Sequence, residues 1–119
     1  MKKKNHGHII SIASLAGQFG QPFMVDYSAT KHAVVGMMDA LHGELLRMGY
    51  DGVKTTTVSP PFVTTTLISN PRCNGFPPIF TPEQMVKETI HAIMTEKVSH
   101  TPIERFSHIS IHHIVRLVK

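Results

Sequence analysis

His8-Ile9-Ile10-Ser11-Ile12-Ala13-Ser14 is the stretch that decides the fold. It is short, apolar and rich in β-branched isoleucine, which is typical of a buried strand in a parallel sheet. Gly17, Gly20 and Pro22 follow it closely and predict a loop. The predicted strand therefore places Ser14 at its carboxyl end, where the loop begins.

A helical pattern runs from about Met24 to Met48, where apolar side chains recur at steps of three and four residues. Gly49 stands where a helix commonly ends, and Asp51-Gly52 predicts a turn. Val53 to Val58 is strongly β-branched and predicts a second strand, which Ser59-Pro60-Pro61 ends. The apolar residues of the helix are Val34, Met37, Met38, Leu41, Leu45 and Met48. We expect Met37, Met38, Met48 and Met85 to pack in the core.

The rest of the chain predicts a loop, a helix and a tail that fits two structures. Proline and glycine make residues 62–80 a long irregular loop, and Thr81-Pro82-Glu83-Gln84 then opens a helix with threonine as its N-cap. Residues 97–103 predict a short last strand, whereas residues 104–119 fit either an amphipathic helix or a partly extended segment. The alternation of strands and helices predicts one α/β region with a parallel sheet over residues 1–119. The apolar face of the second helix consists of Val86, Ile90, Ile93 and Met94.

The composition is that of an ordinary globular chain, with 41% hydrophobic and 17% charged residues among 119. The net charge is +4, and the lysines at positions 2–4 form a cluster at a chain end that we expect to be solvated. Because no aromatic residues alternate with a basic stripe, nucleic acid is not an expected partner. No apolar run is long enough to span a membrane, and the first residues lack the apolar core of a signal peptide.

Cysteine and histidine point to no special chemistry. Cys73 is the only cysteine, which excludes an intrachain disulfide, and its place in a proline-rich loop favours an incidental thiol. The closest histidine groupings are His6 with His8, and His108 with His112 and His113. No cysteine or acidic cluster completes a zinc pattern with them, so we expect no metal site.

Tyr27 and Lys31 stand four residues apart near the start of the predicted long helix. One helical turn separates them, so both side chains lie on one face, and a neighbouring ammonium stabilises the charged form of a phenol. Such a pair alone is common in helices and usually means a surface lysine beside a half-buried tyrosine. Here Ser14 precedes it by thirteen residues, at a strand end of the kind that borders the ligand crevice in parallel sheets. Ser14 and Tyr27 are therefore predicted to meet one substrate oxygen from two sides.

Two segments resemble the active-site stretch of the short-chain dehydrogenases/reductases. They are residues 5–17 (NHGHIISIASLAG) and residues 27–33 (YSATKHA). Within that superfamily the chain most resembles the branch of membrane-associated 17-beta-hydroxysteroid and retinol dehydrogenases. The likeness is specific from Asn5 to about Glu44, looser over residues 58–65, and fades after about Glu96. It implies the C-terminal half of a Rossmann-type, doubly wound parallel sheet, with two or three parallel strands.

The resemblance also implies roles for individual residues. Tyr27 would be the general acid/base that moves a proton to or from the substrate oxygen, and Ser14 would orient and polarise the carbonyl or alcohol group. Lys31 would assist Tyr27 and hydrogen-bond the nicotinamide ribose of NAD or NADP. Hydride would come from the cofactor. The residues assigned to cofactor binding are Tyr27, Lys31, Pro60, Val63 and Thr65.

The chain departs from the family pattern in several places. In the family, a Gly-rich phosphate loop, the residue that selects NAD or NADP, and a catalytic Asn all precede the matching segment; Asn5 lies in the loop before the strand and is not that Asn. Pro61 stands where the family usually has Gly, and proline fixes φ and lacks an N–H. We therefore expect a fragment of an oxidoreductase that does not hold the cofactor alone.

Substrate, partners and location are also implied by resemblance. The loop at residues 62–80 would lie on the substrate side, and its apolar residues suit a lipophilic steroid or retinoid-like alcohol, although simple packing of a lid explains them equally well. The long helix would line a homodimer interface, at the endoplasmic reticulum or a lipid droplet surface. Two alternatives stay open: a non-catalytic truncated product that binds other proteins through its helices or an exposed strand edge, and a lipid-surface module that uses Lys2–Lys4 and the tail. The apolar loop residues are Phe62, Leu67, Ile68, Phe76, Ile79 and Phe80.

Overall fold

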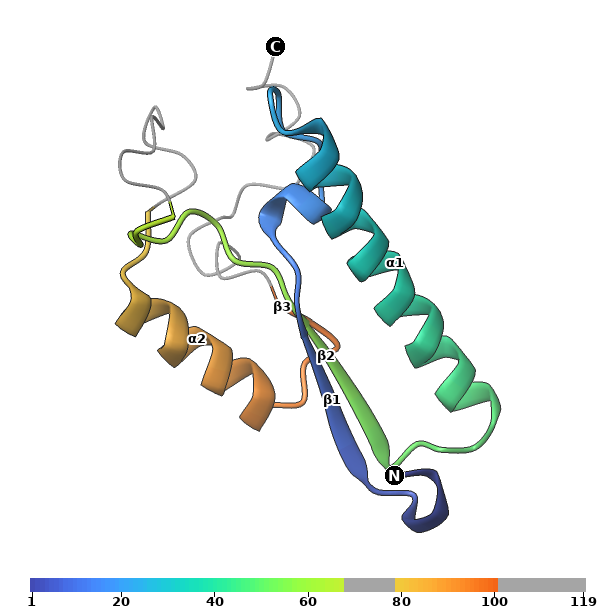
Figure 1. Cartoon of the computed structure of the whole chain (residues 1–119). Helices are drawn as coiled ribbons and strands as arrows, with labels where there is room; N and C mark the ends of the chain where they lie inside the picture. Colours follow the sequence, from blue (N-terminus) through green and yellow to red (C-terminus); the bar gives the residue numbers. More distant parts are fainter. Residues whose placement is uncertain (68–78, 101–119) are drawn as a thin grey trace, which may run out of the picture.

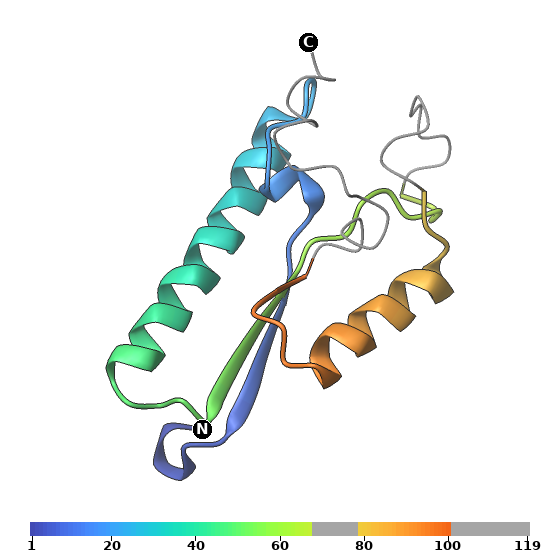
Figure 2. The same cartoon turned by 180° about the vertical axis from the view of Figure 1, so that it is seen from behind.

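The computed structural model describes residues 1–67 and 79–100, and three parallel strands lie between two helices in it (Figure 1). The strands are β1 (Gly7–Ile12), β2 (Val53–Val58) and β3 (Ser99–His100), in the order β1-β2-β3. The helices are α1 (Val25–Arg47) and α2 (Pro82–Met94), which cover opposite faces of the sheet (Figure 2). The short 3-10 helices are η1 (Lys2–Lys4) and η2 (Leu15–Gly17). This layered arrangement confirms the expected α/β class with a parallel sheet.

β2 is the central strand, and its burial differs from that of β1. All residues of β2 except Lys54 are buried, whereas in β1 the side chains of Ile10 and Ile12 are 41% and 52% exposed. The expectation of a fully buried first strand was therefore wrong for the described part of the chain. The reason is position, because β1 pairs only with β2 among the described strands and lies at the edge of that sheet.

Helix α1 ends as its sequence predicts. Gly49 adopts a left-handed φ of 76°, its N–H donates to the carbonyl of Leu46, and the N–H of Tyr50 donates to the carbonyl of Leu45. These two bonds form a Schellman motif, which satisfies carbonyls that have no partner within the helix. The expectation that Met37 and Met48 pack in the core was wrong, since both are more than half exposed, while Met38 and Met85 are buried. One face of a narrow sheet covers only a thin strip of a helix.

Helix α2 begins with the predicted cap but buries a different face. The Thr81 hydroxyl accepts from the N–H of Gln84, and the Gln84 side chain accepts from the N–H of Thr81, which is a complete capping box. Beside it, the pKa of Glu83 is lowered, because its carboxylate is hydrogen-bonded by its own backbone N–H and by Thr81. The apolar residues Val86, Ile90 and Met94 are exposed, and the helix buries Met85, Glu88 and Ala92 instead.

Asn5 has a structural role at the opposite end of the sheet from the strand carboxyl ends. It adopts a left-handed conformation, its amide donates to Asp51 Oδ1 over 2.9 Å, and its Oδ1 accepts from the N–H of Gly52 over 3.1 Å. The hydrogen bond from Asn5 is the largest cause of the lowered pKa of Asp51. Asn5 thus ties the N-terminal turn to the turn that follows α1, in keeping with its separation from the site.

Threonine hydroxyls of β2 connect the sheet to both helical layers. Thr55 Oγ1 lies 3.0 Å from Nδ1 of His42 on α1, and Thr56 Oγ1 donates to the carbonyl of Lys97, after α2, over 2.6 Å. His8 Nε2 lies 2.7 Å from the same Thr56 oxygen. Because the hydroxyl hydrogen of Thr56 is used for Lys97, His8 Nε2 must be the donor. Thr56 is therefore a buried junction between β1, β2 and the end of α2.

Replacing Thr56 by valine is expected to destabilise the chain by about 1–2 kcal/mol, because it leaves the imidazole of His8 and the Lys97 carbonyl without their partner. Thr57→Val serves as the matched control, since Thr57 is also buried and no side-chain hydrogen bond of it is found among residues 1–67 and 79–100. Urea unfolding of both variants measures the difference. Equal midpoints would show that the Thr56 junction contributes nothing.

Three predictions on the later part of the chain have mixed outcomes. Within the predicted strand over residues 97–103, the structure has β3 at Ser99–His100, and residues 101–103 lie outside the described residues. The tail at residues 104–119, with His108, His112 and His113, lies outside the described residues, as does Cys73. The interpretations of the tail, of its histidines and of Cys73 therefore remain predictions.

Candidate active site

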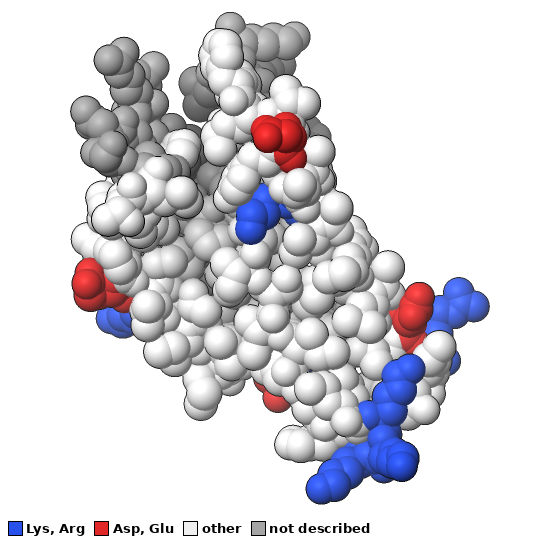
Figure 3. All heavy atoms as spheres, viewed as in Figure 1, with Lys and Arg blue, Asp and Glu red and all other residues white. Residues whose placement is uncertain are grey.

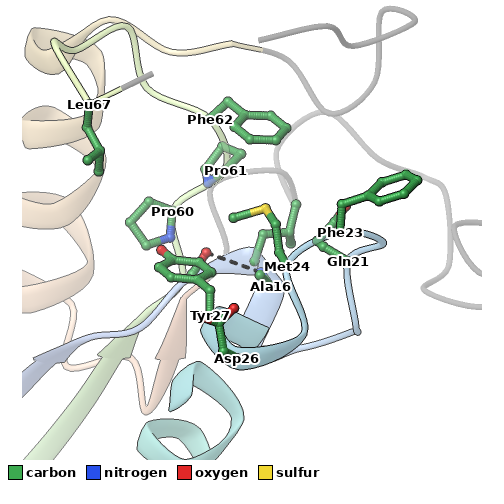
Figure 4. Close-up of a pocket in the computed structure, with 12 residues that line it drawn as sticks. Ala16, Gln21, Phe23, Met24, Asp26, Tyr27, Pro60, Pro61, Phe62 and Leu67 are labelled. Atoms are coloured by element: carbon green, nitrogen blue, oxygen red, sulfur yellow. Dashed lines mark hydrogen bonds between the residues drawn. The ribbon is translucent and has the colours of Figure 1, made fainter. Parts of the chain in front are cut away.

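A cavity of about 440 Å³ opens where β1 and β2 end and α1 begins (Figure 4). One wall comes from Leu15 and Ala16 after β1, together with Pro60, Pro61 and Phe62 after β2. The other wall comes from the segment that leads into α1, and most of the lining is apolar. The carboxyl ends of parallel strands are the usual place of ligand binding in open α/β sheets. The cavity therefore lies where the sequence predicts a site.

Backbone hydrogen bonds hold the two strand ends together beyond the strands themselves. The N–H of Ala13 donates to the carbonyl of Val58 over 2.8 Å, and that of Leu15 donates to the carbonyl of Pro60, also over 2.8 Å. A side-chain bond of 3.2 Å from Gln18 Nε2 to the Oγ of buried Ser59 adds to them. The segments after β1 and β2 thus form one connected wall.

Ser14 lines the cavity from the position just before η2. Its backbone is extended, and its Oγ accepts a hydrogen bond of 3.2 Å from the N–H of Ala16, drawn as the dashed line in Figure 4. A serine oxygen that accepts in this way still has its hydroxyl hydrogen to donate. The bond to Ala16 therefore fixes the Ser14 oxygen and leaves a donor for a ligand oxygen in the cavity.

Tyr27 and Lys31 lie one turn apart at the start of α1. Tyr27 lines the same cavity as Ser14 and is 38% exposed. Lys31 Nζ lies 5.6 Å from the centroid of the Tyr27 ring and donates to the carbonyl of Ile12 over 3.3 Å. The structure thus brings Ser14 and Tyr27 to one cavity, and places the Lys31 ammonium between Tyr27 and the end of β1.

Gly17 allows η2 to approach α1 closely at this point. A Cβ atom on Gly17 would lie 2.6 Å from the carbonyl oxygen of Lys31, which is closer than real Cβ contacts, whereas a Cβ on Gly20 would meet nothing within 4 Å. Only a residue without a side chain fits at position 17 without a shift of the backbone. The separation between Ser14 and Lys31 therefore depends on this glycine.

The residues assigned to the cofactor are not all together. Pro60 lines the cavity, whereas Val63 forms a bridge with Phe80, and Thr65 is exposed. Val63 and Thr65 are not among the residues that line the cavity, so their contact with a nicotinamide stays a prediction. Pro61, the departure from the family pattern, lies in the cavity wall itself.

Sequence reasoning missed the second wall of the cavity. Gln21, Phe23, Met24 and Asp26 line it, and the N–H of Gln21 donates to the Oγ of buried Ser28 over 3.1 Å. That bond fastens the loop before α1 to the first turn of the helix. The available signal was Pro22, which marks a turn but does not say which side of the site the turn faces. Phe62 and Leu67, expected on the substrate side, do line the cavity.

The described residues form neither a metal-binding cluster nor a membrane-spanning helix. Within residues 1–67 and 79–100, no group of three or more His, Cys, Asp or Glu side chains is arranged to hold a metal ion. In the same part of the chain, neither helix combines the length and the apolar character needed to cross a membrane.

Comparison with known proteins gives consistent matches. The family model described as short chain dehydrogenase matches residues 1–73. Estradiol 17-beta-dehydrogenase 11 from Mus musculus is 43% identical over 97 residues, which cover 82% of this chain and 32% of that protein. The chain therefore spans about a third of the length of the curated relatives that it matches.

Solved structures show the same fold. A short chain dehydrogenase/reductase from Burkholderia phymatum in complex with NAD has a TM-score of 0.65 and 24% identity, covering 98% of this chain and 51% of its own. A short chain dehydrogenase from Burkholderia cenocepacia J2315 in complex with NADP has a TM-score of 0.67 and 21% identity, covering 98% of this chain and 48% of its own. These likenesses confirm the expected portion of a Rossmann-type fold.

Proposed function

The chain belongs to the short-chain dehydrogenase family, and we propose that it supplies the proton-transfer part of a nicotinamide-dependent interconversion between a lipophilic alcohol and its carbonyl compound. One observation carries this proposal. Ser14 and Tyr27 come from different elements but line the same apolar cavity, and the ammonium of Lys31 lies beside Tyr27. This arrangement can hold one oxygen atom of a ligand and exchange a proton with it.

The proposed roles follow from the geometry of each side chain. Ser14 donates its hydroxyl hydrogen to the substrate oxygen, because the bond that it accepts from Ala16 fixes its oxygen without using that hydrogen. Tyr27 gives its phenolic proton to that oxygen during reduction and takes a proton from the alcohol during oxidation. The Lys31 ammonium stabilises the negative charge that builds on the phenolic oxygen as its proton leaves.

The cofactor would be NAD or NADP, which supplies or accepts hydride when bound. An ammonium has three donors, and the bond from Lys31 to the Ile12 carbonyl uses one. The remaining donors of Lys31 fit the hydroxyl groups of a ribose. We assign the nicotinamide end to Tyr27, Lys31 and Pro60, and extend that assignment to Val63 and Thr65 on the resemblance alone.

The substrate we propose is a steroid or retinoid-like alcohol. The cavity lining is mostly apolar, with Leu15, Met24, Phe62 and Leu67 around the polar groups of Ser14 and Tyr27. Apolar walls with a few placed polar groups are typical of sites for lipophilic small molecules. The name of the relative, estradiol 17-beta-dehydrogenase 11, points to the same class of substrate.

We also propose self-association through α1 and a location at the endoplasmic reticulum or a lipid droplet. Exposed Met37, with exposed Ala33 and Ala40 near it on α1, supports a helix face that a second copy can cover. Lys2–Lys4 cluster near the N-terminus, at the end of the molecule opposite the cavity (Figure 3). A membrane bound through these lysines would therefore lie away from the cavity, which argues against their use for substrate entry from lipid.

A chimera tests the proposed function. The 97 aligned residues of mouse estradiol 17-beta-dehydrogenase 11 are replaced by those of this chain, and oxidation of estradiol is followed by the absorbance of reduced nicotinamide with NAD and with NADP in turn. We expect turnover with at least one cofactor, because this chain contributes Ser14, Tyr27 and Lys31. A well-folded chimera that binds cofactor but turns over no alcohol would contradict the proposal.

A non-catalytic role is the second candidate, and the exposed side chains of Ile10 and Ile12 on β1 support it. Because β1 lies at the edge of the described sheet, its free side can pair with another protein chain. An inactive but folded chimera would favour this candidate.

A further inference from the structure

Phe23 occupies a backbone position that suits glycine. The N–H of Met24 donates to the carbonyl of Gln21 over 3.2 Å, Pro22 is the second residue of this turn, and Phe23, the third, has a φ of 64°. A turn with proline second and a positive φ third is a type II turn, in which glycine or asparagine is usual at the third place. A bulky residue there is strained.

The side chain of Phe23 is fully exposed as well. Phe23 is among the residues that line the cavity, and Figure 4 shows its ring pointing away from Tyr27. The strained backbone opposes stability, and the exposed ring gains no burial against the described residues that would offset the strain. Strained residues of this kind cluster at active sites and ligand-binding segments.

The cavity changes in character from its inner end to its mouth. Ser14 and Tyr27 provide the polar groups at the inner end, whereas exposed Phe23 and Leu67 lie at the mouth. The loop that carries Phe23 is fastened to α1 by the bond from Gln21 to Ser28, which places its backbone beside the first turn of the helix. A ligand whose oxygen reaches Tyr27 can therefore contact Phe23 only if it is long.

We infer that Phe23 is a specificity-determining residue that contacts the end of an elongated lipophilic substrate, far from the reacting oxygen. The inference rests on the proposed function, since it needs the alcohol oxygen to lie at Ser14 and Tyr27. A compact alcohol fills the inner cavity and does not reach Phe23. An elongated, rigid alcohol covers the ring and removes its apolar surface from water, so Phe23 favours long substrates over short ones.

Phe23→Gly tests the inference, because its effects on stability and on binding have opposite signs. The melting temperature of the chain is expected to stay the same or rise by up to about 4 °C, since glycine relieves the strain. The dissociation constant for estradiol is expected to rise about tenfold, while that for cyclopentanol, a compact alcohol, is unchanged. Calorimetric titration measures the dissociation constant for estradiol, and chemical shift changes in NMR spectra measure that for cyclopentanol.

Two further variants separate the effect of the Phe23 ring from the effect of its backbone strain. Phe23→Ala keeps the left-handed strain, so it is expected to weaken estradiol binding without raising the melting temperature. Leu46→Ala removes another exposed apolar side chain, 54% exposed, from the far part of α1 and should leave the affinity for both alcohols unchanged.

The outcomes distinguish this inference from the function on which it rests. If Ser14→Ala and Tyr27→Phe weaken binding of both alcohols but Phe23→Gly weakens neither, the inference fails and the proposed function stands. If the unchanged chain binds neither alcohol, both fail. If Phe23→Gly lowers co-sedimentation with phosphatidylcholine vesicles and leaves estradiol affinity unchanged, Phe23 contacts lipid, and its role in specificity is refuted.

Discussion

Replacing Tyr27 by phenylalanine is expected to lower kcat of the chimera about a thousandfold, which is the usual contribution of a positioned acid/base group. The substitution removes the proton that Tyr27 is proposed to exchange with the substrate oxygen and keeps the ring in the cavity wall. The dissociation constants for NAD and NADP are expected to change little, because Lys31 and Pro60 are intact. Steady-state kinetics and a separate titration with reduced cofactor measure the two effects.

Tyr50→Phe is the matched control for this prediction, because Tyr50 is the other of the two tyrosines. It is the last residue of the Schellman motif at the far end of α1, and its ring lies beside Lys2, outside the cavity lining. Its substitution should leave kcat unchanged. Retained activity in Tyr27→Phe would refute the role proposed for Tyr27, whatever the control shows.

Gly17→Ala has the largest expected effect on stability, a loss of about 2 kcal/mol. The added Cβ would lie 2.6 Å from the backbone oxygen and 2.8 Å from the carbonyl carbon of Lys31, and neither of these atoms can rotate away. Either η2 or the first turns of α1 must shift, and a shift changes the position of Lys31 relative to Ser14. Urea unfolding of the chain measures the loss, and the chimera shows whether kcat falls with it.

Gly20→Ala controls for the change of glycine to alanine in the same loop. A Cβ at Gly20 meets nothing within 4 Å, so its stability should lie within about 0.5 kcal/mol of the unchanged chain. A Gly17→Ala variant as stable as Gly20→Ala would show that η2 and α1 are not packed as closely as the structure has them.

Secondary structure could be predicted from the sequence because its signals are local. The β-branched run predicts β2 over Val53–Val58, and Thr81 with Gln84 predicts the start of α2, as the structure has them. The burial of apolar side chains was harder to predict. Most of the apolar stripe on α2, and Ile10 and Ile12 of β1, are exposed in the described structure, because burial depends on which layers lie against a face rather than on that face alone.

Part of the candidate site could likewise be predicted from the sequence, and part of it could not. Ser14, Tyr27 and Lys31 could be found from their spacing and from the family pattern, and the structure places them near one another. The wall formed by residues 21–24 could not be found in this way. Its course depends on the positive φ of Phe23, which no residue pattern specifies. The assignments of Val63 and Thr65 rest on resemblance, and both lie outside the cavity lining.

The two walls of the cavity have unequal attachments, and this bears on how a ligand enters. One wall continues from β2, whose buried backbone is paired with β1 along its length and with β3 at its end, so its amide hydrogens exchange only through extensive unfolding. The Gln21–Met24 turn is fastened to α1 by the bond from Gln21 to Ser28, near a helix end, where opening costs little. Local opening would therefore swing Phe23 and Met24 outward while Ser14 stays fixed to the sheet. The ligand would then enter from the side of this turn, while Ser14 keeps its place at the end of β1.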